Sequence, residues 1–268
     1  MGRVIAIANR KGGVGKTTSA INLGAGLATQ GVTTLIIDCD PQSNATGGLG
    51  FPKDPHRRSL YHALLLDTPL ADLIVPCGMD RLSLIPSEKD LIGATIELLD
   101  RPNREHVLRR KLEPIRDRFQ FLILDCPPAM DILTLNALVA ADTVIVPVQC
   151  EYMALEGVSE LRDNLRRLKH SLNPKLEIEG ILLTMYDERT SLAKQVRDDL
   201  RQFFGDKVFA TIIPRNVRLA EAPSFGQPIF LYDPHCRGAE SYLELAKEVI
   251  RGTGLGATGR GQGLGVRG

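Results

Sequence analysis

Residues 11–18 place two lysines, three glycines and two threonines in an order suited to binding phosphate. Glycines let the backbone curl until successive N–H groups point into one concavity. A lysine at the end of such a loop reaches the β- and γ-phosphates of a nucleotide, and the hydroxyl after it ligates Mg²⁺. The segment therefore predicts a phosphate site made of Lys11, Gly12, Gly13, Val14, Gly15, Lys16, Thr17 and Thr18.

The segments on either side are those that a phosphate-binding loop requires. Residues 4–8 (Val-Ile-Ala-Ile-Ala) form a short apolar run, which favours a strand buried on both faces. Residues 18–29 have a helix-compatible composition, and a helix there adds free N–H groups and the positive end of its dipole. The alternative is a glycine turn with two solvated lysines, which leaves the combination of strand, spacing and helix unexplained.

Two acidic segments follow other predicted strands. Residues 121–125 (Phe-Leu-Ile-Leu-Asp) are an apolar run ending in Asp125, which beside such a loop is typical of the Walker B carboxylate that holds the water shell of Mg²⁺. Residues 38–42 read Asp-Cys-Asp-Pro-Gln. For Asp38 we expect either contact with the magnesium shell or ordering of the loop. The alternative for this segment is an Asp-Pro turn that only follows a strand.

Apolar and amphipathic stretches alternate along the rest of the chain. The sequence predicts strands at 32–38, 81–86, 119–125, 142–149, 178–185 and 208–213. It predicts helices at 60–66, 88–99, 106–118, 155–172, 191–204 and 238–251, and a loop at 47–56. This order indicates a single α/β domain with a mostly parallel, twisted sheet and helices on both faces. We assign residues 1–251 to it. Residues 252–268 hold eight glycines, with Arg260 and Arg267, and are expected to be disordered.

Composition sets limits on function. The formal net charge of the 268 residues is +1, so nucleic-acid binding would need a local basic patch. No apolar run approaches the roughly 20 residues that span a bilayer, and the first residues lack a signal-peptide pattern. Five widely spaced cysteines favour buried free thiols over metal ligands or disulfides. We therefore expect a cytoplasmic protein.

The first residues of the loop carry a family resemblance. Arg10 stands where the common P-loop pattern has its first glycine, and a second lysine, Lys11, opens the loop. This resembles the deviant Walker A motif, Lys-Gly-Gly-x-Gly-Lys-[Ser/Thr], of the ParA/MinD/NifH group of P-loop ATPases. The resemblance implies ATP and Mg²⁺ as cofactors, with Thr17, Asp125 (through water) and, as one alternative, Asp38 near the metal. It also implies a homodimer in the ATP state.

The same resemblance assigns further roles. Lys11 would cross the dimer interface to the partner's nucleotide, Lys16 would neutralise phosphate charge, and Asp40 would position the attacking water, so these three form the catalytic set. The family closes the base pocket with loops after two late strands, which here places Met185, Pro214 and Asn216 at adenine. No guanine-selecting Asn-Lys-x-Asp occurs, so ATP is favoured over GTP.

Longer matches indicate the branch. Residues 150–157 (Cys-Glu-Tyr-Met-Ala-Leu-Glu-Gly), 213–224 and 232–240 look like the chromosomal ParA (Soj) proteins. That likeness implies a nucleoid-associated ATPase whose ATP-bound dimer binds double-stranded DNA without sequence preference, and whose ParB-type activator protein stimulates hydrolysis and release. The DNA contacts would come from one basic face, comprising Arg189, Lys194, Arg197, Arg201, Arg215 and Arg218.

Two other members of the group are alternatives. A MinD-like, membrane-associated division-site regulator shares the ATPase core but ends in an amphipathic helix, whereas this chain ends in glycines, so no membrane contact is expected. A NifH-like, cluster-carrying reductase needs cysteines in an arrangement that this sequence does not supply.

Overall fold

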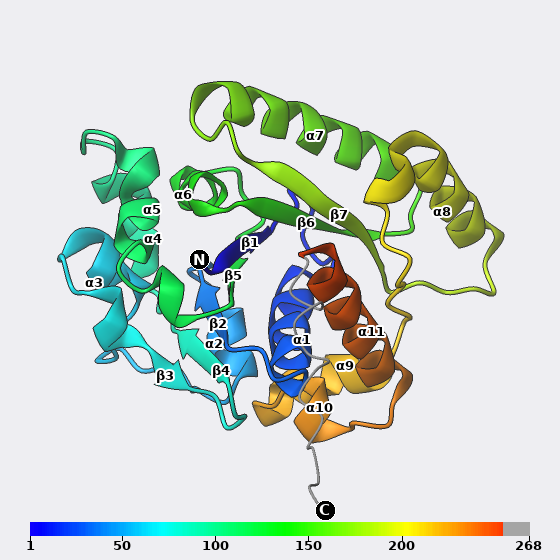
Figure 1. Ribbon diagram of the computed structural model, residues 1–268, viewed down its shortest axis with the longest axis horizontal. Helices are drawn as coiled ribbons and strands as arrows, with labels where there is room; N and C mark the ends of the chain where they lie inside the picture. The colour runs from blue at the N-terminus through cyan, green and yellow to red at the C-terminus, as the bar shows by residue number, and fades with distance from the viewer. Residues whose placement is uncertain (254–268) are drawn as a thin grey trace, which may run out of the picture.

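The strands run through the centre of the protein, with helices on either side (Figure 1). The computed structural model describes residues 1–253, and within that range seven strands form one sheet in the order β3-β4-β2-β5-β1-β6-β7. The strands are β1 (Arg3–Ile7), β2 (Thr34–Asp38), β3 (Val75–Pro76), β4 (Leu82–Ile85), β5 (Phe121–Asp125), β6 (Thr143–Gln149) and β7 (Glu177–Thr184). Only the β3–β4 pair is antiparallel. The predicted mostly parallel α/β sheet is therefore confirmed.

The helices divide between the two faces of the sheet. One face carries α3 (Leu60–Leu65), α4 (Leu91–Glu97), α5 (Val107–Leu112), α6 (Ile132–Ala140), α7 (Ala154–Ser171) and α8 (Ser191–Phe204). The other carries α1 (Lys16–Thr29), α2 (Asn44–Gly48), α9 (Val217–Glu221), α10 (Ile229–Tyr232) and α11 (Arg237–Gly252). No helix within residues 1–253 is long and apolar enough to cross a membrane.

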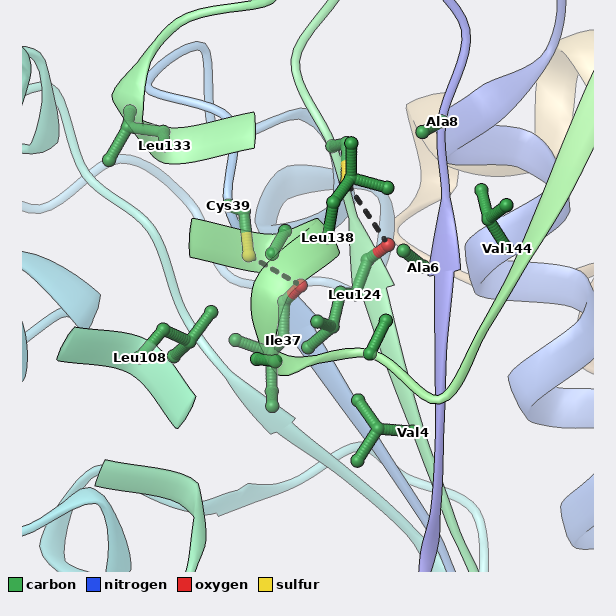
Figure 2. Close-up of a cluster of buried hydrophobic side chains, with 14 of the residues drawn as sticks. Val4, Ala6, Ala8, Ile37, Cys39, Leu108, Leu124, Leu133, Leu138 and Val144 are labelled. Atoms are coloured by element: carbon green, nitrogen blue, oxygen red, sulfur yellow. Dashed lines mark hydrogen bonds between the residues drawn. The ribbon is translucent and has the colours of Figure 1, made fainter. Parts of the chain in front are cut away.

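Alternating side chains of each strand supply both cores. Val4 and Ala6 of β1 pack on the α6 face beside Leu124 of β5 (Figure 2), whereas Ile5 and Ile7 point to the α1 face. All five of these side chains are fully buried. A parallel strand covered on both faces needs an unbroken apolar run, and this explains why residues 4–8 show no polar alternation.

One predicted strand is wrong. Residues 208–213 form no strand: they make an isolated bridge to β7 at Val208, and the amides of Phe209 and Ile213 donate to β7 carbonyls at 3.0 and 2.9 Å. Between these contacts, the amides of Ala210 and Thr211 donate to the carboxylate of Glu248 on α11 at 2.8 and 3.0 Å. These two amides bond α11 in place of a neighbouring strand, so no continuous ladder forms.

Other boundaries also differ from the predictions. The predicted helix at 106–118 is shorter, because Pro114 follows α5 and only a 3₁₀ turn (Arg116–Arg118) continues it. Helix α2 extends into the predicted loop at 47–56, and the two-residue edge strand β3 was not predicted. All five cysteines are free, three of them buried and two half-buried. The predicted disordered tail lies outside the described residues except for Gly252, which ends α11, and Thr253.

The central strands end together at one edge of the sheet. In the parallel register, Asp125 of β5 lies opposite Ile7 of β1 on one side and Asp38 of β2 on the other. The glycine-rich loop leaves the sheet at the end of β1, between β5 and β6. Ligands of open parallel sheets bind outside the carboxyl ends of the strands where the strand order reverses, and this edge is such a position.

Candidate functional site

The glycine-rich loop has the backbone that its sequence predicts. Gly13 and Gly15 have φ values of 74° and 84°, a region that favours glycine, and α1 starts immediately afterwards at Lys16. Asn9 fixes the entrance of the loop, because its Oδ1 accepts from the Lys11 amide at 3.0 Å and its Nδ2 donates to the Pro147 carbonyl at 2.7 Å. The loop is therefore held between β1 and β6 with its helix N-terminus free for an anion.

Lys16 points back along this loop. Its Nζ donates to the carbonyl of Lys11 at 3.0 Å, and the residue is only 7% exposed. Burial lowers the pKa of Lys16, and the nearby Asp125 carboxylate opposes that shift. A buried ammonium lying across a loop of free amides is well placed to meet phosphate oxygens.

Asp125 lacks the hydrogen bonds that a buried carboxylate needs. Both oxygens are buried, and within residues 1–253 neither accepts a hydrogen bond of normal geometry. Burial raises the pKa of Asp125 well above its usual value, and the charge of Asp38 adds to this, whereas the Thr17 hydroxyl and Lys16 act in the opposite direction. A hydrated cation beside Thr17 would supply the missing donors, so these residues fit the predicted magnesium position.

Asp38 has a different environment, although it lies next to Asp125 in the sheet. One of its oxygens accepts from the amide and hydroxyl of Thr46 at 2.9 and 2.7 Å, and the other accepts from the Asp40 amide at 3.1 Å. Burial raises the pKa of Asp38 to about 6, against these hydrogen bonds. Of the two roles expected for Asp38, these contacts favour ordering of the 40–46 loop.

Asp40 is held at the mouth of the site. Its Oδ1 accepts from the Gln42 amide at 2.9 Å, and its carbonyl accepts from the Ser87 hydroxyl at 2.7 Å. Within the described part of the chain, no donor is bonded to its Oδ2. This leaves one carboxylate oxygen available to a water molecule.

A cavity of about 650 Å³ joins the predicted phosphate and base positions. Lys16, Thr17 and Asp40 line it at one end, and Met185, Pro214 and Asn216 line it as well. Asn216 uses its Oδ1 to cap α9, accepting from the Arg218 amide at 2.8 Å. The residues assigned to phosphate and to adenine thus surround one space, which is the arrangement that a nucleotide requires.

Sequence reasoning missed several residues of this cavity. They come from segments far from the loop, and include Gln42, Asn44, Pro128, Thr184, Val217, Leu219 and Tyr242. The Thr184 hydroxyl donates to the Val14 carbonyl at 2.8 Å, and Tyr242 shares a 3.0 Å hydrogen bond with Ser19 of α1. The packing of β7 and α11 against the loop brings Thr184 and Tyr242 to the cavity, and no local motif near the loop marks either position.

Lys11 lies apart from the cavity lining. Its side chain is about half exposed and forms an ion pair with Glu151, which precedes α7. Within its own subunit the Lys11 ammonium is therefore directed to the protein surface, whereas Lys16 lies within the site.

Five of the six predicted DNA-contact residues lie on α8 or in the loops beside the end of β7, whereas Arg218 lies on α9, which covers the opposite face of the sheet from α8. Lys194, Arg197 and Arg201 follow one another along α8 at a spacing that shares a helix face. Arg189 makes two hydrogen bonds to Asp187, at 2.9 and 2.7 Å, and Arg218 pairs with Glu221 at 3.0 Å. Arg215 follows Pro214, which is predicted to contact the base, and is exposed. Arg197 also pairs with Asp198 at 2.8 Å, so three of the six are paired with acids from their own chain.

Comparison with known proteins agrees with this geometry. Residues 2–178 match the family model of an AAA domain. The chromosome partitioning protein ParA of Caulobacter vibrioides is 51% identical over 250 residues (92% of this chain, 94% of that protein). The sporulation initiation inhibitor protein Soj of Bacillus subtilis is 52% identical over 249 residues (93% and 98%).

A solved structure extends the comparison to the fold. Cobyrinic acid a,c-diamide synthase from Mycobacterium smegmatis, with a bound ATP analogue and magnesium, superposes with a TM-score of 0.83 at 36% identity, covering 97% of this chain and 98% of that one. The match spans the loop, the sheet and α11 together. The chain therefore belongs to the AAA-domain family of P-loop ATPases and, within it, to the ParA/Soj chromosome-partitioning proteins.

Proposed function

We propose that the protein hydrolyses ATP to ADP and phosphate in order to switch its hold on DNA. In this proposal the ATP-bound form is a homodimer that binds double-stranded DNA without sequence preference, and a ParB-type activator protein stimulates hydrolysis and release. The protein would act in the cytoplasm on the nucleoid. The observation that carries the proposal is the single cavity bordered by Lys16, Thr17 and Asp40 at one end and by the 214–216 segment at the other.

Each residue near the phosphates has a distinct task. The loop amides and Lys16 bind the phosphate oxygens and neutralise charge that develops during transfer. Thr17 and, through water, Asp125 would hold Mg²⁺, which when bound neutralises further phosphate charge. Asp40, whose backbone and one oxygen are already fixed, orients the attacking water with the other oxygen.

The position of Lys11 supports a site completed by a second subunit. Its side chain is half exposed, pairs within residues 1–253 with the half-exposed carboxylate of Glu151, and lies outside the lining of its own cavity. An exposed ion pair of this kind contributes little, so exchanging Glu151 for a partner's phosphate costs little. In a twofold dimer each Lys11 reaches the other subunit's nucleotide, and ATP then joins the two copies.

Dimerisation would also double the basic surface. Arg189, Arg218 and the arginines of α8 contact phosphates rather than base edges, which gives binding that is insensitive to sequence and steep in salt. One subunit offers few such contacts, so only the ATP-bound dimer holds DNA firmly. The curated relatives named for chromosome partitioning favour this function over the MinD-like alternative.

Co-sedimentation with a mixed-sequence duplex in ATP, in ADP and without nucleotide tests the proposal. We expect binding only in ATP, and weaker binding by Arg189→Glu and Arg218→Glu. Arg110→Glu is the matched control, because Arg110 is an exposed arginine of α5 and lies away from the β7 side. Flotation with anionic vesicles is measured alongside. Equal DNA binding in ATP and ADP, or ATP-dependent vesicle binding without DNA binding, would contradict the proposal.

A further inference from the structure

A second hollow, of about 370 Å³, lies directly behind the base end of the nucleotide cavity. It is lined by the residues that follow β7, by the 214–215 segment and by the start of α11, namely Tyr186, Asp187, Glu188, Arg189, Pro214, Arg215 and Arg237. Pro214 and Arg215 line both spaces, so they form a shared wall.

The side chains that line this hollow carry a net positive charge, and one of the acids among them is already paired with an arginine. Three arginines face two acids, and Asp187 is already bonded to Arg189 through both of its oxygens. This pairing lowers the pKa of Asp187 to about 2. Arg215 and Arg237 are exposed, and neither takes part in an ion pair within residues 1–253. Two guanidinium groups therefore remain for an anion from outside the chain, opposed by one further acid of the described lining, Glu188.

We infer that this hollow seats one phosphodiester group of the DNA backbone, with Arg237 as a further DNA-contacting residue and Asp187 as the counter-charge that limits affinity. The inference rests on the proposed DNA-binding function. Guanidinium groups bind phosphate oxygens through paired N–H donors, and two of them converging on one hollow fit a phosphodiester better than a lone lysine would. Backbone contact of this kind carries no sequence preference.

The wall of the hollow connects it to the nucleotide cavity. The Tyr186 amide donates to the Ile213 carbonyl at 3.0 Å, and the Arg215 amide donates to the Tyr186 carbonyl at 3.0 Å, so the two segments move as one. A base in the cavity would pack against Pro214, and the next residue along this wall, Arg215, lines the hollow as well as the cavity. Nucleotide binding thus fixes the segment that carries one of the phosphate contacts.

Arg237→Ala is the direct test, with Arg251→Ala as its matched control. Both are exposed arginines of α11, but Arg251 lies at the opposite end of the helix. Affinity of the full chain in ATP for a mixed-sequence duplex is measured over a range of salt concentrations, and ATP-dependent dimerisation is measured on the same samples. Removing one phosphate-binding side chain lowers the salt slope by about 0.9, which corresponds to about eightfold weaker binding near 0.1 M salt relative to 1 M.

Asp187→Asn tests the inference in the opposite direction, because removing this acid should strengthen DNA binding. An asparagine retains the local turn, whose oxygen accepts from the Arg189 amide, but no longer neutralises the guanidinium. We expect tighter DNA binding with a steeper salt slope. These two results with an unchanged Arg251→Ala would support the inference.

The outcomes separate this inference from the proposed function. If Arg237→Ala binds like the wild type while Arg189→Glu loses affinity, the hollow is not a phosphate site and the DNA-binding proposal stands. If Arg251→Ala weakens binding as much as Arg237→Ala, the effect is one of net charge and the inference fails. If the wild type binds no DNA in ATP, both proposals fall together.

Discussion

Asp125→Asn should make the nucleotide-free protein more stable while removing its response to Mg²⁺ and ATP. The carboxylate is fully buried at the end of β5 and has no normal hydrogen bond within residues 1–253. A buried polar group without partners costs about 1–3 kcal/mol, more when charged, and the asparagine removes the charge at nearly constant volume. In chelator without nucleotide, we expect the free energy of unfolding to rise by about 2 kcal/mol at neutral pH.

The pH dependence of this gain follows from the direction of the pKa shift. An unfolded aspartate titrates near 3.8, and the folded pKa of Asp125 is raised well above that value. Between the two pKa values the folded state binds more protons, so the wild type loses stability as pH rises. Asp38 contributes with the same sign, since its pKa is raised from 3.8 to about 6, a difference worth about 3 kcal/mol at ~1.4 kcal/mol per pH unit.

The assay is urea unfolding of wild type and Asp125→Asn at about pH 4, close to the pKa of an unfolded aspartate, and at neutral pH, where the loss of wild-type stability with rising pH has progressed further. The increase in unfolding free energy of Asp125→Asn over the wild type should be near zero at about pH 4 and larger at neutral pH. Thermal unfolding with MgATP should then show a large upward shift for the wild type and a small one for the variant. A variant less stable at neutral pH, or a gain independent of pH, would refute this account of the carboxylate.

Two further predictions concern the same edge of the sheet, and a third concerns the close contact between Gly226 and Gly50. Lys11→Ala should bind ATP but remain monomeric by size exclusion in ATP; a persisting dimer would count against its role across the interface. Asp40→Ala should bind ATP, turn it over at least ~100-fold more slowly and accumulate as a dimer, and unchanged phosphate release would remove Asp40 from the mechanism. Gly226→Ala should lower unfolding stability by about 2 kcal/mol or more, because its φ is 65° and a Cβ would lie 2.5 Å from the Cα of Gly50. Equal denaturation midpoints would show that this contact relaxes freely.

The parts of the site that could be predicted are those encoded in continuous segments. The loop can be predicted because its conformational requirements lie within six residues of the sequence. Gly13 and Gly15 must adopt positive φ, and Lys16 must begin a helix. Asp38 and Asp125 could be predicted because parallel strands place their carboxyl ends at one edge. Local chemistry and topology were sufficient for these features.

The remaining features depend on contacts between distant segments. Residues 208–213 have the composition of a strand, but two of their amides donate hydrogen bonds to Glu248 of α11 and not to a neighbouring strand. The two roles expected for Asp38 differ only in whether Thr46 satisfies its oxygens, which no sequence pattern reveals. Arg237 lies 48 positions after Arg189, and only the packing of α11 beside the end of β7 brings them to one hollow.

Several of the cationic groups that we assign to phosphate and DNA already have partners within the chain, and such pairing makes ligand binding readily reversible. Lys16 bonds the Lys11 carbonyl, Lys11 pairs with Glu151, and Arg189 pairs with Asp187. Binding a phosphate therefore exchanges one partner for another, and its net free energy is a difference between two similar interactions. At the exposed pairs this difference is small and falls with salt, so many contacts must act together. In the proposed function, a dimer that doubles these contacts and hydrolysis that separates the dimer would turn DNA binding on and off.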